Sequence, residues 1–179
     1  MNPFFTIGHS VRPLGVFIGL LQEADVRLVA DVRAIPRSRT NPQYNGDTLP
    51  ISLSGPQIGY EHFAELGGRR GRQPNVPQAT NAFWQNGSFH HYADYAMGRD
   101  FHGALERLQQ RGRAGRCAIM CAETLWWRCH RRIIADYLIA GGQTVFHILG
   151  PGHVAQAIMT SAAKLGANGA ITYPARLND

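Results

Sequence analysis

The sequence predicts an α/β fold, with a mostly parallel, open sheet flanked by helices and a single domain over residues 1–179. Two observations predict this class. Short apolar runs rich in β-branched residues alternate with segments whose apolar residues recur every three or four positions, as in strands joined by crossover helices. The chain is also of a length typical of one domain with one hydrophobic core. It contains no internal repeat, and no linker divides it.

Four apolar runs are expected to be strands of one sheet. They cover residues 4–7, 26–32, 117–120 and 144–149, and residues 58–62 are a candidate for a further short strand. Parallel strands end at a common edge, where open α/β sheets bind their ligands. The loops that follow the first, second and 117–120 strands should therefore converge there.

The helices are expected in the intervening segments. Pro13 marks a first helical turn, and further helices are expected over residues 89–97, after Asp100, from His130 to Gly141 and over residues 154–165. Residues 34–57, rich in Pro, Ser, Asn and Gly, are expected to form a long loop.

The first two strand ends carry polar residues but no dinucleotide fingerprint. The first strand is followed by Gly8, His9 and Ser10, and Asp31 and Arg33 lie at the end of the second. An acidic residue in the position of Asp31 would hold a ribose only beside a glycine-rich turn, and Gly8 stands alone. The sequence thus predicts a Rossmann-like sheet without a dinucleotide cofactor. Asp31 is expected to cap the loop or to pair with a nearby arginine.

The helix after the 117–120 strand brings reactive side chains into its first turn. At about 100° per residue, His130 lies on the inward face, with Cys129 and Arg131 on either side. A helix N-terminus favours an anion, so this turn is a candidate phosphate site. Arg132 and Asp136 fall on the outer face and are expected to form a solvated ion pair.

The three cysteines are expected to be reduced thiols with different roles. Cys121, at a strand end near a helix N-terminus, should have a lowered pKa. Cys117 lies in mid-strand and should only pack, whereas Cys129 fits packing and function equally well. The pattern Cys-x5-Arg of the phosphatases is absent, because Arg128 comes one residue too late.

These positions define one predicted pocket at the carboxyl edge of the sheet. An arginine cluster at the start of the 34–57 loop suits an anionic ligand there. The candidate catalytic residues are Cys121, Glu123, His130 and His9. The candidate ligand-binding residues are Ser10, Asp31, Arg33, Arg37, Arg39, Cys129 and Arg131.

Several short motifs occur together in this chain. They are Thr-Ile-Gly-His-Ser at 6–10, Asp-Val-Arg-x-x-Pro-x-Ser-Arg at 31–39, Tyr-x-His with Leu-Gly-Gly at 60–68, Tyr-Ala-Asp-Tyr at 92–95, and Met-Cys-Ala-Glu followed by Cys-His-Arg-Arg at 120–132. Together they resemble the signature of the DUF488 family, over about residues 4–149. The resemblance implies no established reaction or cofactor.

The charge of the chain suggests its class of partner. The net charge is +6, the isoelectric point is about 9.7, and seventeen arginines stand against one lysine. This composition favours a nucleotide or nucleic acid as partner, although genomic base composition gives the same arginine excess. No apolar run is long enough for a membrane span and no signal peptide is apparent, so a cytoplasmic location without membrane association is expected.

Three hypotheses remain open from the sequence. The first is an enzyme or binder that acts on a phosphate-bearing ligand, with Cys121, Glu123 and His130 as its chemical groups. The second is a metal-binding protein that uses Cys121, Cys129 and His130, in a spacing that is not a standard zinc pattern and with a fourth ligand from elsewhere, such as His9. The third is a non-catalytic nucleic-acid or protein binding module.

Overall fold

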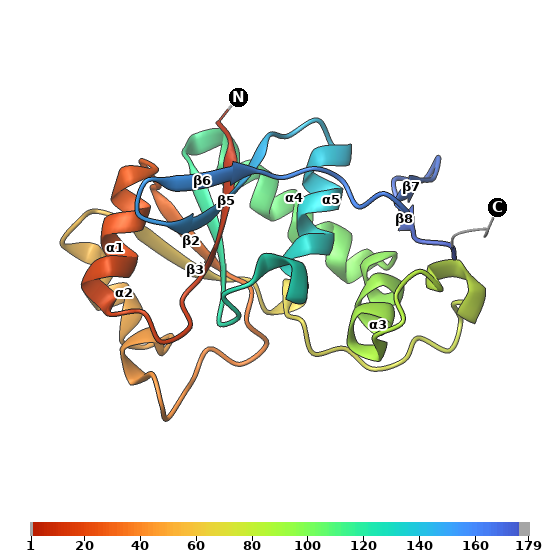
Figure 1. Ribbon diagram of the computed structural model, residues 1–179, viewed down its shortest axis with the longest axis horizontal. Coiled ribbons are helices and arrows are strands. Elements are labelled where there is room, and N and C mark those ends of the chain that lie inside the picture. The colour runs from red at the N-terminus through yellow and green to blue at the C-terminus, as the bar shows by residue number, and fades with distance from the viewer. Residues whose placement is uncertain (1, 176–179) are drawn as a thin grey trace.

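The computed structural model describes residues 2–175 and confirms the predicted α/β class, with a mostly parallel, open sheet (Figure 1). The sheet order is β3-β2-β4-β1-β5-β6, in which β1 to β5 run parallel and β6 pairs antiparallel with β5. The strands are β1 (Phe4–Gly8), β2 (Leu28–Asp31), β3 (Gly59–His62), β4 (Cys117–Cys121), β5 (Val145–Gly150) and β6 (His153–Gln156).

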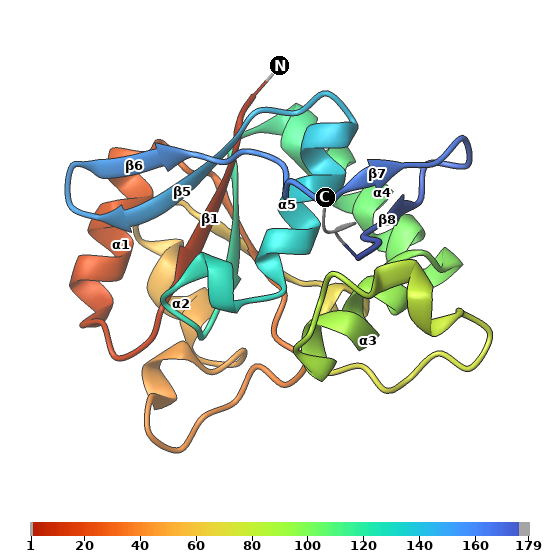
Figure 2. The same ribbon diagram turned by 45° about the vertical axis from the view of Figure 1, so that its right-hand side comes forward.

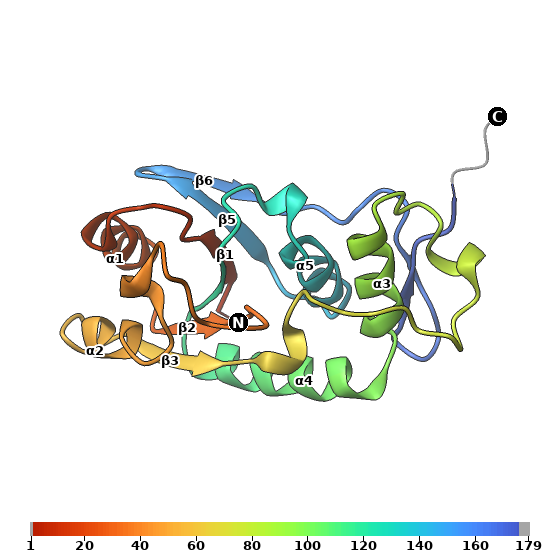
Figure 3. The same ribbon diagram turned by 90° about the horizontal axis from the view of Figure 1, so that it is seen from below.

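Five α-helices flank this sheet in the described part of the chain. They are α1 (Leu14–Glu23), α2 (Leu49–Ser54), α3 (Gly87–Ala96), α4 (Arg99–Ala114) and α5 (Arg131–Ala140). Figure 3 shows α1 and α2 on one side of the sheet and α4 and α5 on the other. None of the helices within residues 2–175 combines the length and apolar character that crossing a membrane requires.

Alternate strand residues feed two cores, as expected for a sheet covered on both faces. Phe4, Ile119 and Val145 belong to the core under α4 and α5, whereas Phe5, Ile7 and Met120 belong to the core under α1 and α2. The central strands β1 and β4 are paired in register, with Phe4 opposite Cys117 and Gly8 opposite Cys121. This register places both strand ends side by side.

The segment 34–57 is not the continuous loop that its composition predicted. It contains the short 3-10 helix Pro42–Tyr44 and the helix α2. Leu49 and Leu53 of α2 are completely buried. Pro50 occupies the first helical turn, where a backbone N–H group has no partner within the helix, so proline loses no hydrogen bond there. Burial of this leucine pair against the sheet outweighs the polar composition around it.

The predicted helix over residues 154–165 is wrong. Gly152 adopts a left-handed φ of 63°, and the chain turns back so that β6 pairs with β5, a hairpin that is visible in Figure 2. Val154 and Ile158, which an amphipathic helix would bury, are exposed. Without β6, the strand β5 would have unpaired backbone N–H and C=O groups at the edge of the sheet. Residues 153–156 form hydrogen bonds with them as the strand β6 and therefore do not form a helix.

The predicted ion pair between Arg132 and Asp136 is also wrong. Asp136 is only 1% exposed and accepts hydrogen bonds from the Thr160 N–H group (2.8 Å) and the Tyr173 hydroxyl (2.9 Å). Arg132 donates to the Thr160 hydroxyl (3.0 Å) and lies over the Trp84 ring. The chain after β6 covers the outer face of α5 and ends in the strands β7 (Lys164–Leu165) and β8 (Ile171–Thr172), which Figure 1 shows near α3.

Candidate functional site

A cavity of about 690 Å³ lies at the carboxyl edge of the sheet. The loops after β1, β2 and β4 converge on it as predicted, together with Gly68, Arg69 and the start of α3. Eight of the predicted residues line it: His9, Ser10, Arg33, Arg37, Cys121, Glu123, Cys129 and His130.

Three of the predicted residues do not line this cavity. Asp31 is completely buried and lies behind Arg33, to which it is bonded. Arg131 is 1% exposed and lies beneath the cavity wall, so the prediction that it faces the ligand is not met. Arg39 is exposed and lies outside the cavity, although it follows Arg37 closely in sequence.

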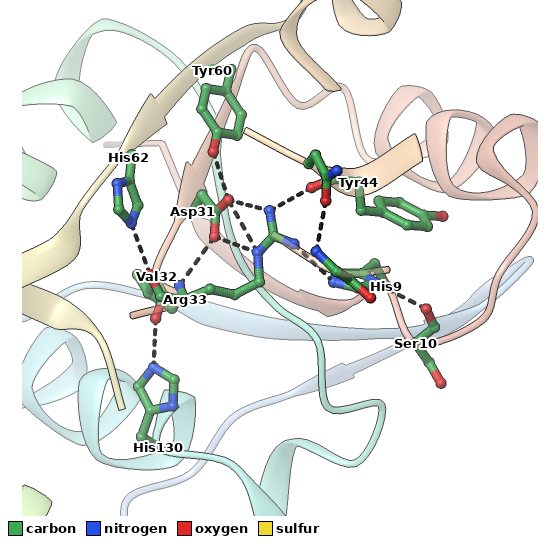
Figure 4. Close-up of polar contacts among 11 residues, drawn as sticks. His9, Ser10, Asp31, Val32, Arg33, Tyr44, Tyr60, His62 and His130 are labelled. Carbon is green, nitrogen blue, oxygen red and sulfur yellow. Dashed lines mark hydrogen bonds and ion pairs between the residues drawn. The ribbon is translucent and has the colours of Figure 1, made fainter. Parts of the chain in front are cut away.

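The Asp31 carboxylate organises one wall of the cavity (Figure 4). It accepts from the Arg33 guanidinium at 2.5–3.1 Å and from the Tyr60 hydroxyl at 2.6 Å. Burial raises the pKa of Tyr60, which keeps its hydroxyl protonated as the donor. Arg33 also donates to the Tyr44 carbonyl (2.6 Å). The predicted pairing of Asp31 with a nearby arginine is therefore confirmed, and the pair is buried.

His9 is held on this wall as a neutral side chain. Its ring stacks on Tyr44, its Nδ1 lies 2.9 Å from the Ser10 carbonyl, and its Nε2 lies 3.2 Å from the Arg33 guanidinium. Because a carbonyl only accepts and a guanidinium only donates, Nδ1 carries the proton and Nε2 is the acceptor. Burial lowers the pKa of His9 to about 4, which agrees with this assignment.

His130 is held from the opposite side of the cavity. It is the N-cap of α5, and its Nε2 lies 2.9 Å from the Val32 carbonyl (Figure 4). Nε2 must therefore carry a proton, and Nδ1 points toward the Cys129 sulfur at 3.5 Å. The Arg33 carbonyl is bonded in the same way by His62 (2.8 Å), so two histidines fix the backbone after β2.

The two cavity thiols have opposite pKa shifts, and the prediction for Cys121 is wrong. The hydrogen bond to Cys129, together with burial, raises the pKa of Cys121. Although burial acts to raise the pKa of Cys129, the bond from Cys121 and the nearby His130 and Arg131 lower it overall. Cys129 is thus the thiolate of the pair, and Cys121 is its hydrogen-bond donor.

Arg131 supports the site from below. Its Nε donates to the Cys129 sulfur at 3.2 Å, and its Nη2 donates to the Glu123 carbonyl. It thereby joins the first turn of α5 to the loop that follows β4. Cys117, in contrast, is fully buried, as predicted, although it is the first residue of β4 and does not lie in mid-strand.

Among the cavity residues that the sequence did not predict, three bear on function: Gly68, Arg69 and Arg128. Arg69 and Arg128 line the cavity, and their side chains make no hydrogen bond or ion pair with any residue in the range 2–175. Gly68 packs against His130 so closely that a Cβ there would lie 2.4 Å from Nδ1. The Leu-Gly-Gly motif was the available sequence signal for Gly68. No sequence pattern around Arg69 distinguishes it, as a cavity residue, from the exposed Arg72.

His147 is a second buried neutral histidine near the site, and it predicts a pH dependence. It stacks on Trp126 and bonds the Thr6 hydroxyl (2.7 Å). Burial lowers its pKa from 6.5 to about 4, as for His9. The unfolded chain binds more protons between these values, so the free energy of unfolding should fall from pH 6.5 to pH 4, by roughly 3 kcal/mol for each histidine.

The test of this dependence is urea denaturation over that pH range. His147→Gln should flatten the slope of stability against pH, because the group that titrates is gone. His153→Gln, which changes an exposed histidine on β6, should leave the slope as it is. A slope that is the same in His147→Gln and in the unaltered protein would contradict the prediction.

Comparison with known proteins agrees with the resemblance of the motifs. Residues 13–138, more than two thirds of the chain, match the family described as "Domain of unknown function DUF488". No curated protein and no solved structure shows significant similarity to the chain. The match includes Asp31, Arg33, Cys121, Cys129 and His130, and it leaves out His9 and Ser10. The chain therefore belongs to the DUF488 family.

Proposed function

We propose that this cavity binds an anionic, phosphate-bearing ligand, either a nucleotide or a nucleic acid. The observation that carries the proposal is the charge of the lining. Besides the Cys129 thiolate, the charged lining residues are four arginines and a single carboxylate: Arg33, Arg37, Arg69, Arg128 and Glu123. Arginine side chains bind phosphate oxygens in pairs of charge-assisted hydrogen bonds, so this lining suits a phosphate group.

The arginines of the cavity differ in their availability. Arg33 is already bonded to Asp31, and Arg37 makes a weak exposed pair with Asp47 at 3.5 Å. Arg69 and Arg128 keep all their donors for a ligand, since neither is paired within residues 2–175. The proposal therefore assigns the phosphate contacts to Arg69 and Arg128, and a wall of fixed positive charge to Arg33.

The candidate catalytic residues would meet the rest of the ligand. Cys121, Glu123 and His130 line the cavity beside the Cys129 thiolate, so a bound ligand would contact a nucleophile and acid–base groups. Both ring nitrogens of His9 are engaged, which supports a positioning role for it through Arg33. Whether a bound ligand reacts or is only held separates the enzyme hypothesis from the binding-module hypothesis.

The test is a binding measurement on single variants. Arg69→Ala and Arg128→Ala should each weaken the binding of a nucleotide or a short single-stranded oligonucleotide about tenfold to a hundredfold, the effect of losing a hydrogen bond to a charged group. The ligand is first found by a thermal-shift screen of nucleoside mono-, di- and triphosphates and of RNA and DNA oligonucleotides. Titration calorimetry then gives the dissociation constants.

Two further variants separate a site from general positive charge. Arg72→Ala removes an exposed arginine three residues after Arg69, and Arg113→Ala removes one near the start of β4, at the opposite edge of the sheet. Both should bind like the unaltered protein at fixed salt concentration. Equal weakening in all four variants would mean nonspecific attraction, and a screen in which no anion raises the melting temperature would favour a binding module for another protein.

A further inference from the structure

Three potential metal ligands gather at the floor of the cavity. The donor atoms of Cys121, Cys129 and His130 all lie within 4.8 Å of one another. They come from the end of β4 and the start of α5, two segments that the Arg131 side chain ties together. All three residues also line the cavity, so an ion bound to them would contact a ligand bound in the cavity.

The spacing of two of these atoms, the Cys129 sulfur and the His130 Nδ1, fits a tetrahedral ion. The Cys129 sulfur and the His130 Nδ1 are 3.5 Å apart. In a tetrahedral zinc site, with Zn–S near 2.3 Å and Zn–N near 2.05 Å, that edge of the tetrahedron is about 3.6 Å long. The pair is thus already at ligand spacing.

The orientation of His130 is that of a metal ligand. Its Nε2–H group donates to the Val32 carbonyl, so Nδ1, which lies 3.5 Å from the Cys129 sulfur, is the ring nitrogen left to bind a metal ion. Ligating histidines almost always donate their other N–H group to a carbonyl or carboxylate in this way. Gly68 keeps Nδ1 accessible, because a Cβ at that position would lie 2.4 Å from it.

We propose that Cys121, Cys129 and His130 bind one Zn²⁺ ion whose fourth position opens into the cavity. Two thiolates and an imidazole form a donor set that suits zinc, and the two thiolates balance the charge of the ion. Arg131 donates to the Cys129 sulfur and stabilises it as a ligand.

The fourth position is left for water or for an oxygen of the cavity's ligand. His9, the fourth ligand considered from the sequence, is not available, since its ring nitrogens bond the Ser10 carbonyl and Arg33. Three protein ligands with one open position are typical of catalytic zinc, whereas structural zinc sites are closed by four.

The test uses the full-length reduced protein, stripped of metal with a chelator, and titrates it with Co²⁺ in the absence of any nucleotide. One equivalent should bind, with the visible absorption of tetrahedral cobalt and a near-ultraviolet thiolate band, and Zn²⁺ should displace it. Cys121→Ala, Cys129→Ala and His130→Ala should each lower the Co²⁺ affinity at least tenfold. Cys117→Ala removes a thiol from the same strand as Cys121 and should bind like the unaltered protein.

Two measurements keep the result clear if a cysteine variant folds poorly. Gly68→Ala leaves every thiol in place and should still weaken Co²⁺ binding, because its methyl group would displace His130. Zn²⁺ should also raise the melting temperature of the unaltered protein. Absence of cobalt binding with all thiols reduced would overturn the proposal, as would binding that persists without both Cys121 and Cys129. Since no nucleotide is present, the phosphate proposal stands or fails separately.

Discussion

Replacing Asp31 with alanine should lower the free energy of unfolding by about 3–5 kcal/mol, the cost of leaving one partner of a buried ion pair alone. Asp31 is completely buried, and the side chain of its partner Arg33 is only 6% exposed. The change would leave the guanidinium without its counter-charge and the Tyr60 hydroxyl without its acceptor. Urea denaturation, followed by circular dichroism, measures the loss.

A surface pair and a double variant test whether burial is the cause. Asp47→Ala breaks the exposed pair with Arg37 and should cost less than about 1 kcal/mol. In the double variant Asp31→Ala/Arg33→Met the unpaired charge is gone, so part of the stability should return. A loss as small in Asp31→Ala as in Asp47→Ala would show that the buried pair is not what holds this wall.

The second large effect is expected at Gly8, the last residue of β1. A Cβ at this position would lie 2.1 Å from the Glu123 carbonyl oxygen and 2.7 Å from the Thr124 Cα atom. Both are backbone atoms, so no side-chain rotation relieves the overlap. Gly8→Ala should therefore lower the free energy of unfolding by about 3 kcal/mol, at the upper end of the usual cost of overpacking.

The same substitution should loosen the site, because the displaced segment joins Cys121 to α5. The Glu123 carbonyl accepts from Arg131, which in turn contacts the Cys129 sulfur. Cys121 and Cys129 should accordingly react faster with a thiol reagent in Gly8→Ala, under native conditions. Gly19→Ala is the control: it lies within α1 with no atom near its Cβ, and it should stabilise the protein by up to about 1 kcal/mol. If Gly8→Ala is as stable as the unaltered protein, Gly8 does not pack against the backbone of Glu123 and Thr124 as closely as described.

Much of the fold and part of the site follow from the sequence by itself. The strand runs were recognisable because buried parallel strands are short and continuously apolar, and their alternation with helical patterns leaves few topologies. The common edge of the sheet then gathers His9, Arg33, Cys121 and His130, whatever the details of packing. The motifs at these positions also identified the family, and the match over residues 13–138 confirms it.

Only the tertiary structure decided what each of these groups does. A pKa depends on neighbours in space, so the assignment of the thiolate to Cys129 required the positions of Cys121, His130 and Arg131. Helical periodicity predicted on which face of α5 each residue lies, but it did not predict which other segment of the chain packs on that face. The segment that carries Thr160 and Tyr173 buries the face on which Asp136 was expected to be solvated. Likewise, the local Asp31–Arg33 pair is fixed in place by Tyr60, far along the chain, and no local pattern shows that Arg69, within residues 2–175, has no such partner.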